Sequence, residues 1–207
     1  MNYKIIGSGS SGNAVIINDV ILIDCGVPFK ALREAYDKIK LVLFTHIHGD
    51  HFNRSTIKKL ASERPTLRFA CGEWLEGELR SMVRRVDVLD IGKIYNYGEF
   101  KVSPVKLYHD VPNCGYRVFW GNEKLLYATD TSTMQGIVAK NYDLYMLERN
   151  YEEHEIAERI KRKESKGQFA YEVRAMHNHL SEQQCNKFLV ENAGANSEYI
   201  YMHMHRE

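Results

Sequence analysis

One short segment of the chain, FTHIHGDHFN, concentrates side chains of the metal-binding type. Directly after the apolar run Leu41–Phe44, three of the nine histidines and one aspartate fall within six positions: His46, His48, Asp50 and His51. The apolar run predicts a buried strand, so these polar residues lie where the strand ends and a loop begins. We therefore expect a fold that collects polar ligands at a strand end without disturbing its core.

The spacing within this cluster predicts two adjacent metal positions rather than one. His46 and His48 are two residues apart, so an extended backbone directs both imidazoles to the same side. Asp50 and His51 begin the next predicted helix, which turns their side chains toward a neighbouring point. Imidazoles and carboxylates are ligands that divalent transition metals accept. The H-x-H-x-D-H order is therefore interpreted as ligands shared between two ions.

Three further candidate ligands occupy the same kind of position elsewhere in the chain. His109 follows VSPVKLY, Asp130 follows KLLYAT, and His203 follows EYIYM. Each of them ends an apolar run that predicts a strand. Because one loop cannot complete two coordination spheres, we expect these residues to join the first cluster in one composite site.

The remaining pattern predicts one α/β domain of mostly β character over residues 1–207. Gly121 and Asn122 are typical of a hairpin turn, and Ser181 is a good N-cap for the helix that follows it. Expected strands cover 3–6, 14–17, 20–24, 41–45, 67–70, 86–89, 100–107, 116–120, 124–128, 144–147 and 199–202. Expected helices cover 29–38, 54–62, 72–83, 152–163 and 182–192.

Composition excludes several classes of protein. The net charge is +1, so nucleic-acid binding would have to come from a local patch. The four cysteines are scattered without a C-x-x-C pair, which disfavours a zinc ribbon and a disulfide framework. Neither an apolar signal region nor a run of about 20 apolar residues occurs. We therefore expect a cytoplasmic protein that does not enter the membrane.

The ligand pattern resembles that of the metallo-β-lactamase superfamily. Further segments resemble, in order, the small YycJ (WalJ) group, which is related to ribonuclease Z and PhnP: GSGSSGNAVII, ILIDCG, HDVPNCGYRV, LLYATDTS, LYMLERN, NHLSEQQ and YMHMHRE. The resemblance covers nearly the whole chain. It implies a four-layer αββα sandwich with a dinuclear metal site at one edge.

The resemblance also implies a role for individual residues. His46, His48 and His109 would hold one metal, and a second group would hold the other: Asp50, His51 and His203. Asp130 would bridge the two ions, and Asp24 would orient a ligand histidine. His205 competes with His203 as the last ligand, and His203 is favoured because it follows its strand directly.

Two divalent ions, Zn²⁺ or Mn²⁺, can share one water and lower its pKa toward neutrality, which indicates a hydrolase. Glu148 and His179 match the pair that is thought to protonate the leaving group in ribonuclease Z relatives. The candidate catalytic residues are Asp50, His179 and Glu148. His48 disfavours a redox di-iron site, because the flavodiiron relatives have glutamate there. Asp130 disfavours β-lactam hydrolysis, because the zinc β-lactamases have cysteine at that position.

The sequence constrains the identity of the substrate less than it constrains the type of reaction. Between Asp130 and His203 lie 72 residues, too few for the β-CASP domain of ribonuclease J. The YycJ resemblance implies a DNA exonuclease, and two basic segments could contact phosphates: Glu158–Lys166 and Arg80–Arg85. Neither segment contains the aromatic residues expected of a single-strand stacking platform.

The alternative functions are a cyclic or other small-molecule phosphodiesterase and a mononuclear iron sulfur-dioxygenase. The dioxygenase would use only His46, His109 and Asp130. The oligomeric state stays open.

Overall fold

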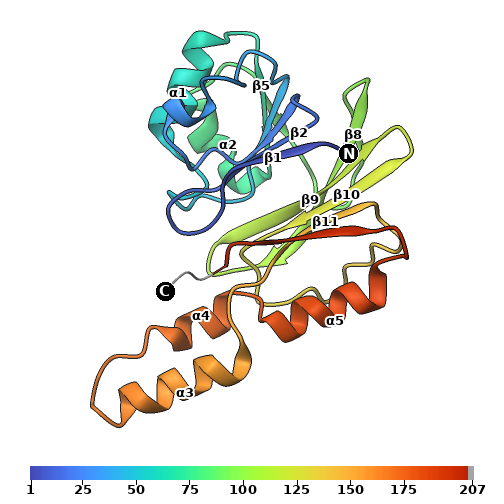
Figure 1. Ribbon diagram of the computed structural model, residues 1–207. Helices are drawn as coiled ribbons and strands as arrows, with labels where there is room; N and C mark the ends of the chain where they lie inside the picture. Colours follow the sequence, from blue (N-terminus) through green and yellow to red (C-terminus); the bar gives the residue numbers. More distant parts are fainter. Residues whose placement is uncertain (205–207) are drawn as a thin grey trace.

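The computed structural model describes residues 1–204 and contains two six-stranded sheets, each built from one continuous half of the chain (Figure 1). The first sheet has the order β1-β2-β3-β4-β5-β6, with strands Tyr3–Gly7, Ala14–Ile17, Ile21–Ile23, Leu41–Leu43, Arg68–Cys71 and Val86–Val88. The second has the order β12-β11-β10-β9-β8-β7, and β7 to β12 are Tyr95–Asn96, Phe100–Tyr108, Pro112–Trp120, Glu123–Ala128, Leu144–Glu148 and Glu198–Met202.

Alternating side chains explain why the two sheets pack face to face. In the first sheet Val15, Ile23 and Leu43 point toward the second sheet, where they join a core with Tyr116 and Tyr127. The neighbouring residues on the same strands point to the opposite face, as the two-residue period of a strand requires. Both faces of the first sheet are therefore buried, which accounts for its nearly continuous apolar strands.

Helices cover the outer faces of both sheets and complete four layers. α1 (Arg54–Glu63) and α2 (Glu73–Arg80) pack on the first sheet, and α5 (Glu182–Asn192) packs on the second. α3 (Glu153–Glu164) and α4 (Glu172–Asn178) form a hairpin that extends away from the sheets (Figure 1). The predicted αββα sandwich is confirmed. None of the helices in residues 1–204 combines the length and hydropathy needed to span a bilayer.

The structure also corrects some local predictions. The helix expected over 29–38 is wrong: only the 3₁₀ turn Phe29–Leu32 forms, and the following residues make further turns. No side chain caps the first N–H groups of that turn, so nothing favours its extension. Strand β7 and helix α4 were not predicted, because two residues and seven residues are too short for a clear periodic pattern.

Candidate metal centre

The seven predicted ligands lie together at one edge of the sandwich, where β4, β8, β10 and β12 end. The structure places their nitrogen and oxygen atoms in three overlapping groups, and within each group the atoms lie within 4.8 Å of one another. The groups are His46–His48–His109, Asp50–His51–His203 and His46–His51–Asp130. The first sheet supplies four of the residues and the second sheet supplies three, so the site spans the seam between the sheets.

In the first group, three imidazoles converge on one point. Nδ1 of His48 lies 3.2 Å from Nε2 of His46 and 3.3 Å from Nε2 of His109. A neutral imidazole has one donor and one acceptor, so three ring nitrogens around one point cannot satisfy one another fully. This convergence is the arrangement expected of ligands to a single cation.

In the second group, carboxylates and imidazoles alternate. Nε2 of His203 lies 3.7 Å from an Asp50 oxygen and 3.6 Å from an Asp130 oxygen. The other oxygen of Asp130 lies 2.9 Å from Nε2 of His51. Because Asp130 also belongs to the group that contains His46, it stands between the first and second groups, in the position of a shared ligand.

Sharp backbone turns aim three of the carboxylates and imidazoles into the site. Asp24 and His203 directly follow β3 and β12, and Asp130 is the second residue after β10; their φ angles are 59°, 49° and 58°. Positive φ is uncommon for residues other than glycine, and Asp and His are among the types that tolerate it. Such strained conformations collect at functional sites, where the surrounding structure holds them in place.

Asp24 is completely buried and orients His51. Its carboxylate accepts hydrogen bonds from the backbone N–H and the hydroxyl of Thr45, and it lies 2.7 Å from Nδ1 of His51. Burial raises the pKa of Asp24, and the contact with His51 opposes that rise. Since Nδ1 of His51 is occupied by Asp24, Nε2 is the nitrogen that faces the candidate metal position.

Glu148 holds His179 beside the same cluster. An oxygen of the fully buried Glu148 lies 2.6 Å from Nδ1 of His179, and the other accepts hydrogen bonds from the N–H groups of Thr131 and Leu180. Burial lowers the pKa of His179, but the hydrogen bond and the charge of Glu148 outweigh it, so the net pKa is raised. The side chain of His179 is 19% exposed, so a substrate can reach it.

Two residues of the site were missed by the sequence interpretation. Nδ2 of the buried Asn13 lies 2.8 Å from Nε2 of His51, and Asn13 also binds the backbone of Asp50. Asp110 has one oxygen 3.3 Å from Nε2 of His48 and 3.2 Å from Nε2 of His109. The adjacent His-Asp pair in HDVPNCGYRV was the signal for Asp110, whereas Asn13 had no comparable signal.

The site fits divalent metal ions on its own chemistry. Within residues 1–204, Asp130 Oδ2 and His203 Nε2 are buried and have no hydrogen-bond partner, although both lie near opposite charges. Burial opposes the charge on His203, yet the nearby carboxylates of Asp50 and Glu148 raise its pKa to about 10. The carboxylates therefore attract positive charge strongly, and unpaired ligand atoms aim at it. His205, the competing last ligand, lies outside the described residues.

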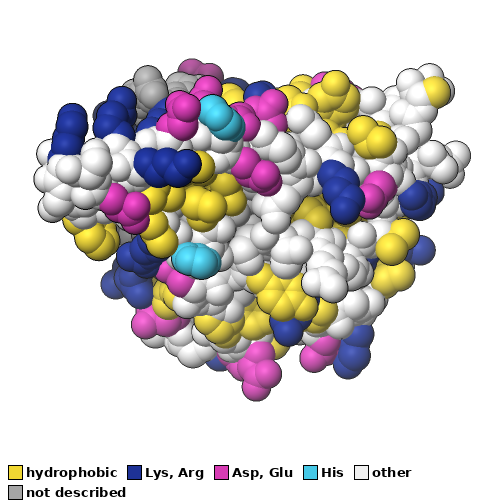
Figure 2. Space-filling view, turned by 90° about the horizontal axis from the view of Figure 1, so that it is seen from below, with side chains coloured by type: hydrophobic (Ala, Val, Ile, Leu, Met, Phe, Trp, Pro, Cys, Tyr) yellow, Lys and Arg dark blue, Asp and Glu magenta, His cyan; other side chains and the backbone are white. Residues whose placement is uncertain are grey.

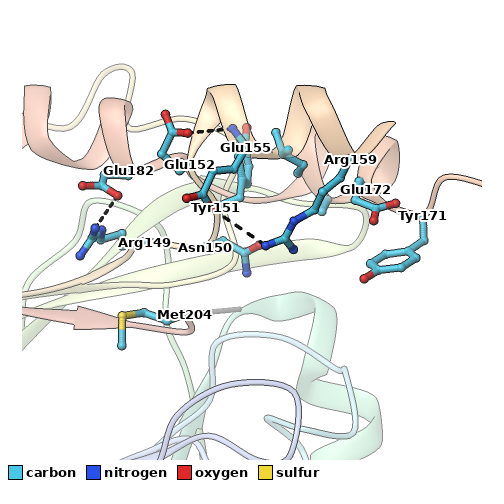
Figure 3. Close-up of a pocket in the computed structure, with 12 residues that line it drawn as sticks. Arg149, Asn150, Tyr151, Glu152, Glu155, Arg159, Tyr171, Glu172, Glu182 and Met204 are labelled. Atoms are coloured by element: carbon cyan, nitrogen blue, oxygen red, sulfur yellow. Dashed lines mark hydrogen bonds and ion pairs between the residues drawn. The ribbon is translucent and has the colours of Figure 1, made fainter. Parts of the chain in front are cut away.

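A pocket adjoins the second group on the side of the helices, and Figure 3 shows it. Asn150 connects the two, because it donates a hydrogen bond to the backbone oxygen of His203 and also lines the pocket. Arg149 pairs with Glu182 at one end. Four glutamates line the pocket: Glu152, Glu155, Glu172 and Glu182. Arg149 and Arg159 line it as well, so the pocket contains charges of both signs.

Several solved structures share this fold at low sequence identity. YhfI from Bacillus subtilis, a metallo-β-lactamase fold protein, has a TM-score of 0.76 and 17% identity, over 98% of this chain and 85% of that chain. The short form of human tRNase Z has a TM-score of 0.72 and 16% identity, over 100% and 93%. A diphosphatase from the PhnP family has a TM-score of 0.67 and 17% identity, over 98% and 86%.

Sequence comparison agrees with the structural comparison. A search of curated proteins finds no match. A family model described as the beta-lactamase superfamily domain matches residues 20–204, which include all seven predicted ligands. Both the αββα sandwich and the cluster of histidines and aspartates at its edge are thus accounted for by one family, and this chain belongs to the beta-lactamase superfamily domain family.

Proposed function

We propose that the protein is a metal-dependent phosphodiesterase that acts on nucleic acid, with DNA as the leading substrate. The observation that carries the proposal is the joint placement of two ligand groups around Asp130 and of the Glu148–His179 pair beside them. The fold family consists mostly of metal-dependent hydrolases, and one of the structures that share this fold is the human protein named tRNase Z.

The ligand residues define what the site would bind. His46, His48 and His109 would hold one divalent ion, and a second group would hold the other: Asp50, His51 and His203. A bound pair of ions supplies Lewis-acid polarisation of the phosphoryl oxygen and a water of lowered pKa. Imidazole and carboxylate ligands suit Zn²⁺ and also Mn²⁺.

His179 is the proposed proton donor to the leaving oxygen. Glu148 occupies Nδ1 of the ring, which leaves Nε2 free to face a substrate. The raised pKa of His179 favours the protonated ring, the form that a general acid requires. The backbone bonds from Thr131 and Leu180 fix Glu148, so Glu148 acts by positioning and charging His179.

Two other activities are distinguished by the substrate and by the metal content. The similarity to a diphosphatase of the PhnP family favours a small phosphate compound as the second candidate substrate. An iron sulfur-dioxygenase would use only His46, His109 and Asp130, and would leave the second group without a role. The convergence of Asp50, His51 and His203 therefore favours hydrolysis.

The experiment that tests the proposal combines metal analysis with a substrate panel. The protein is loaded with Zn²⁺ or Mn²⁺ and assayed on 5′-labelled duplex DNA, single-stranded DNA, RNA and cyclic nucleotides. About two ions per chain and cleavage of a nucleic acid are expected. One iron per chain with oxygen consumption would contradict the proposal, and cleavage of cyclic nucleotides alone would replace nucleic acid with the small substrate.

A further inference from the structure

The α3–α4 hairpin, called here the arm (residues 153–178), reaches directly from the metal centre. The backbone oxygen of Asn178, the last residue of α4, lies 2.9 Å from Nδ1 of His109. One turn earlier, Arg174 pairs with Asp110 at 2.6 Å, and Asp110 contacts His48 and His109. From this anchored end the arm projects away from both sheets (Figure 1). A molecule that lies along the arm is therefore led toward the metal-binding residues.

Apolar side chains of the arm are unusually exposed. Twelve large hydrophobic residues are exposed in residues 1–204, and four of them fall between positions 169 and 176. Phe169 is 86% exposed and Tyr171 is 48% exposed, and they are joined by Val173 and Met176. Single exposed apolar residues need no explanation, but a group of this kind marks a surface that contacts something else.

One cation lies against this apolar group, and further cations belong to the same arm. Nζ of Lys163 lies 3.9 Å from the centre of the Tyr171 ring. Lys161, Arg162 and Lys166 belong to the same arm, and none of them has an ion-pair partner among the described residues. In the view from below, Lys and Arg side chains gather with hydrophobic ones at the left end, where the arm lies (Figure 2). The arm thus combines exposed aromatic rings with available positive charge.

This combination could not be seen in the basic segment Glu158–Lys166 alone, which contains no aromatic residue. The turn after Lys166 reverses the chain, so Tyr171 comes back against Lys163. Alternating cations and aromatic rings are the features with which proteins hold single-stranded nucleic acid, by binding phosphates and stacking bases. The fold supplies the interleaving that the sequence lacks.

We propose that the arm binds the single-stranded end of a nucleic acid, with a base stacked on Phe169 and phosphates near Lys161, Arg162 and Lys166. The inference rests on the proposed phosphodiesterase function and specifies its substrate as a strand with an unpaired end. The seven residues of α4 span about 10 Å, which corresponds to about three stacked nucleotides between the rings and the metal centre.

Charge argues for this occupant against a second copy of the chain. Over residues 153–178 the arm has six basic and five acidic residues, but all six basic ones and only two of the acidic ones lie between positions 159 and 174. One of those two, Glu172, is already paired with Lys163. Two arms packed against each other would bring Lys161, Arg162 and Lys166 close to their own copies, which is unfavourable. A polyanion with flat apolar rings complements both the charge and the exposed aromatics.

Binding is tested on metal-free protein by fluorescence anisotropy with a labelled 20-residue oligo(dT) strand and a blunt 20-base-pair duplex. Tighter binding of the single strand is expected. Phe169→Ala should weaken that binding at least about fivefold, the cost of one stacked base. Replacing Lys161, Arg162 and Lys166 together by Gln should reduce the salt slope, log Kd against log salt, by about 2. Tyr199→Ala is the matched control, because Tyr199 is 51% exposed on β12 and lies outside the arm.

Hydrolysis of bis(p-nitrophenyl) phosphate separates this inference from the proposed function. The arm variants should hydrolyse it at the wild-type rate, because it is too small to reach the arm. Equal affinity for strand and duplex, or no loss in Phe169→Ala, would overturn the arm proposal even if the compound is hydrolysed. Absence of hydrolysis with either metal would refute the proposed phosphodiesterase function. The binding measurements would still test whether the arm binds single-stranded nucleic acid. Loss of a dimer in Phe169→Ala with unchanged DNA binding would assign the surface to a second copy.

Discussion

The two sides of the candidate metal centre are built in different ways. On the first sheet, one loop supplies four ligands, and buried hydrogen bonds that Asp24 accepts and Asn13 donates fix it. On the second sheet, His109, Asp130 and His203 come from three separate strand ends. The first side is therefore a local motif that carries its own support, whereas the second side exists only when distant strands are in register.

The residues that surround the ligands differ in exposure between the two sides. Asp24 and Asn13 behind the first side are fully buried, although the side chains of the ligands His48 and Asp50 are 33% and 25% exposed. On the second side His179 and Asp110 are partly exposed, and α4 leads outward from them. This contrast suggests that the first side sets the ion positions while the second side meets the substrate. Substitutions on the two sides should then have different effects.

The largest effect is expected from Asp130→Ala, since Asp130 touches both sides. Its oxygens lie within 3.6 Å of His51, His179 and His203. We expect hydrolysis of bis(p-nitrophenyl) phosphate to fall by more than about 1,000-fold, beyond the usual cost of one electrostatic contact. The exposed Asp37→Ala is the control. Retained activity with metal still bound would refute Asp130 as the shared ligand.

The next effect separates chemistry from metal binding. His179→Ala should slow esters with poor leaving groups about 100-fold or more, because they need a proton donor. Hydrolysis of p-nitrophenyl esters should change much less, and metal content should stay the same. His177→Ala, two residues away and exposed, serves as the control. Equal losses for good and poor leaving groups would count against His179 as the acid.

A matched pair of substitutions compares the supports of the two sides. Asp24→Asn should weaken Zn²⁺ binding about 10- to 100-fold, because the carboxylate that orients His51 is lost. Glu148→Gln should instead reduce kcat for poor leaving groups, since His179 loses the charge that raises its pKa. A competing chelator measures the first effect and steady-state kinetics measure the second. If both variants lose metal equally, the two sides are not distinct.

The smallest expected effect is the release of a proton from His203 when metal binds. In the metal-free protein the pKa of His203 is raised to about 10, so His203 holds a proton at pH 7. Coordination requires the neutral imidazole, so metal binding should release about one proton from His203, and affinity should fall as the pH is lowered. Calorimetry in buffers of different ionisation enthalpy measures the release. His203→Gln should remove it, and an unchanged release would disprove the assignment.

The contrast between a local ligand loop and ligands from separate strand ends also explains what the sequence could predict. The loop FTHIHGDHFN is recognisable because its ligands are adjacent, and α5 because Ser181 and Gln184 form its capping box. Asn13 and Asp110 were missed because their contacts join residues of different segments. Helix α4 lacks both a capping side chain and sufficient length, so its pairing with α3 decides its fold. Local patterns were therefore visible, and partnerships between distant segments were not.

The division of the two sheets between the two halves of the chain has a consequence for assembly. Within residues 1–204 the chain passes from β6 to β7 once, and no later strand returns to the first sheet. A cut within residues 89–94 would give two fragments, each with the strands of one complete sheet. The cut would divide all three groups of predicted ligands; for example, His46 and His48 would be separated from His109. Recombination of the fragments would therefore depend on the supply of divalent ions, which would hold the two halves together as long as they are bound.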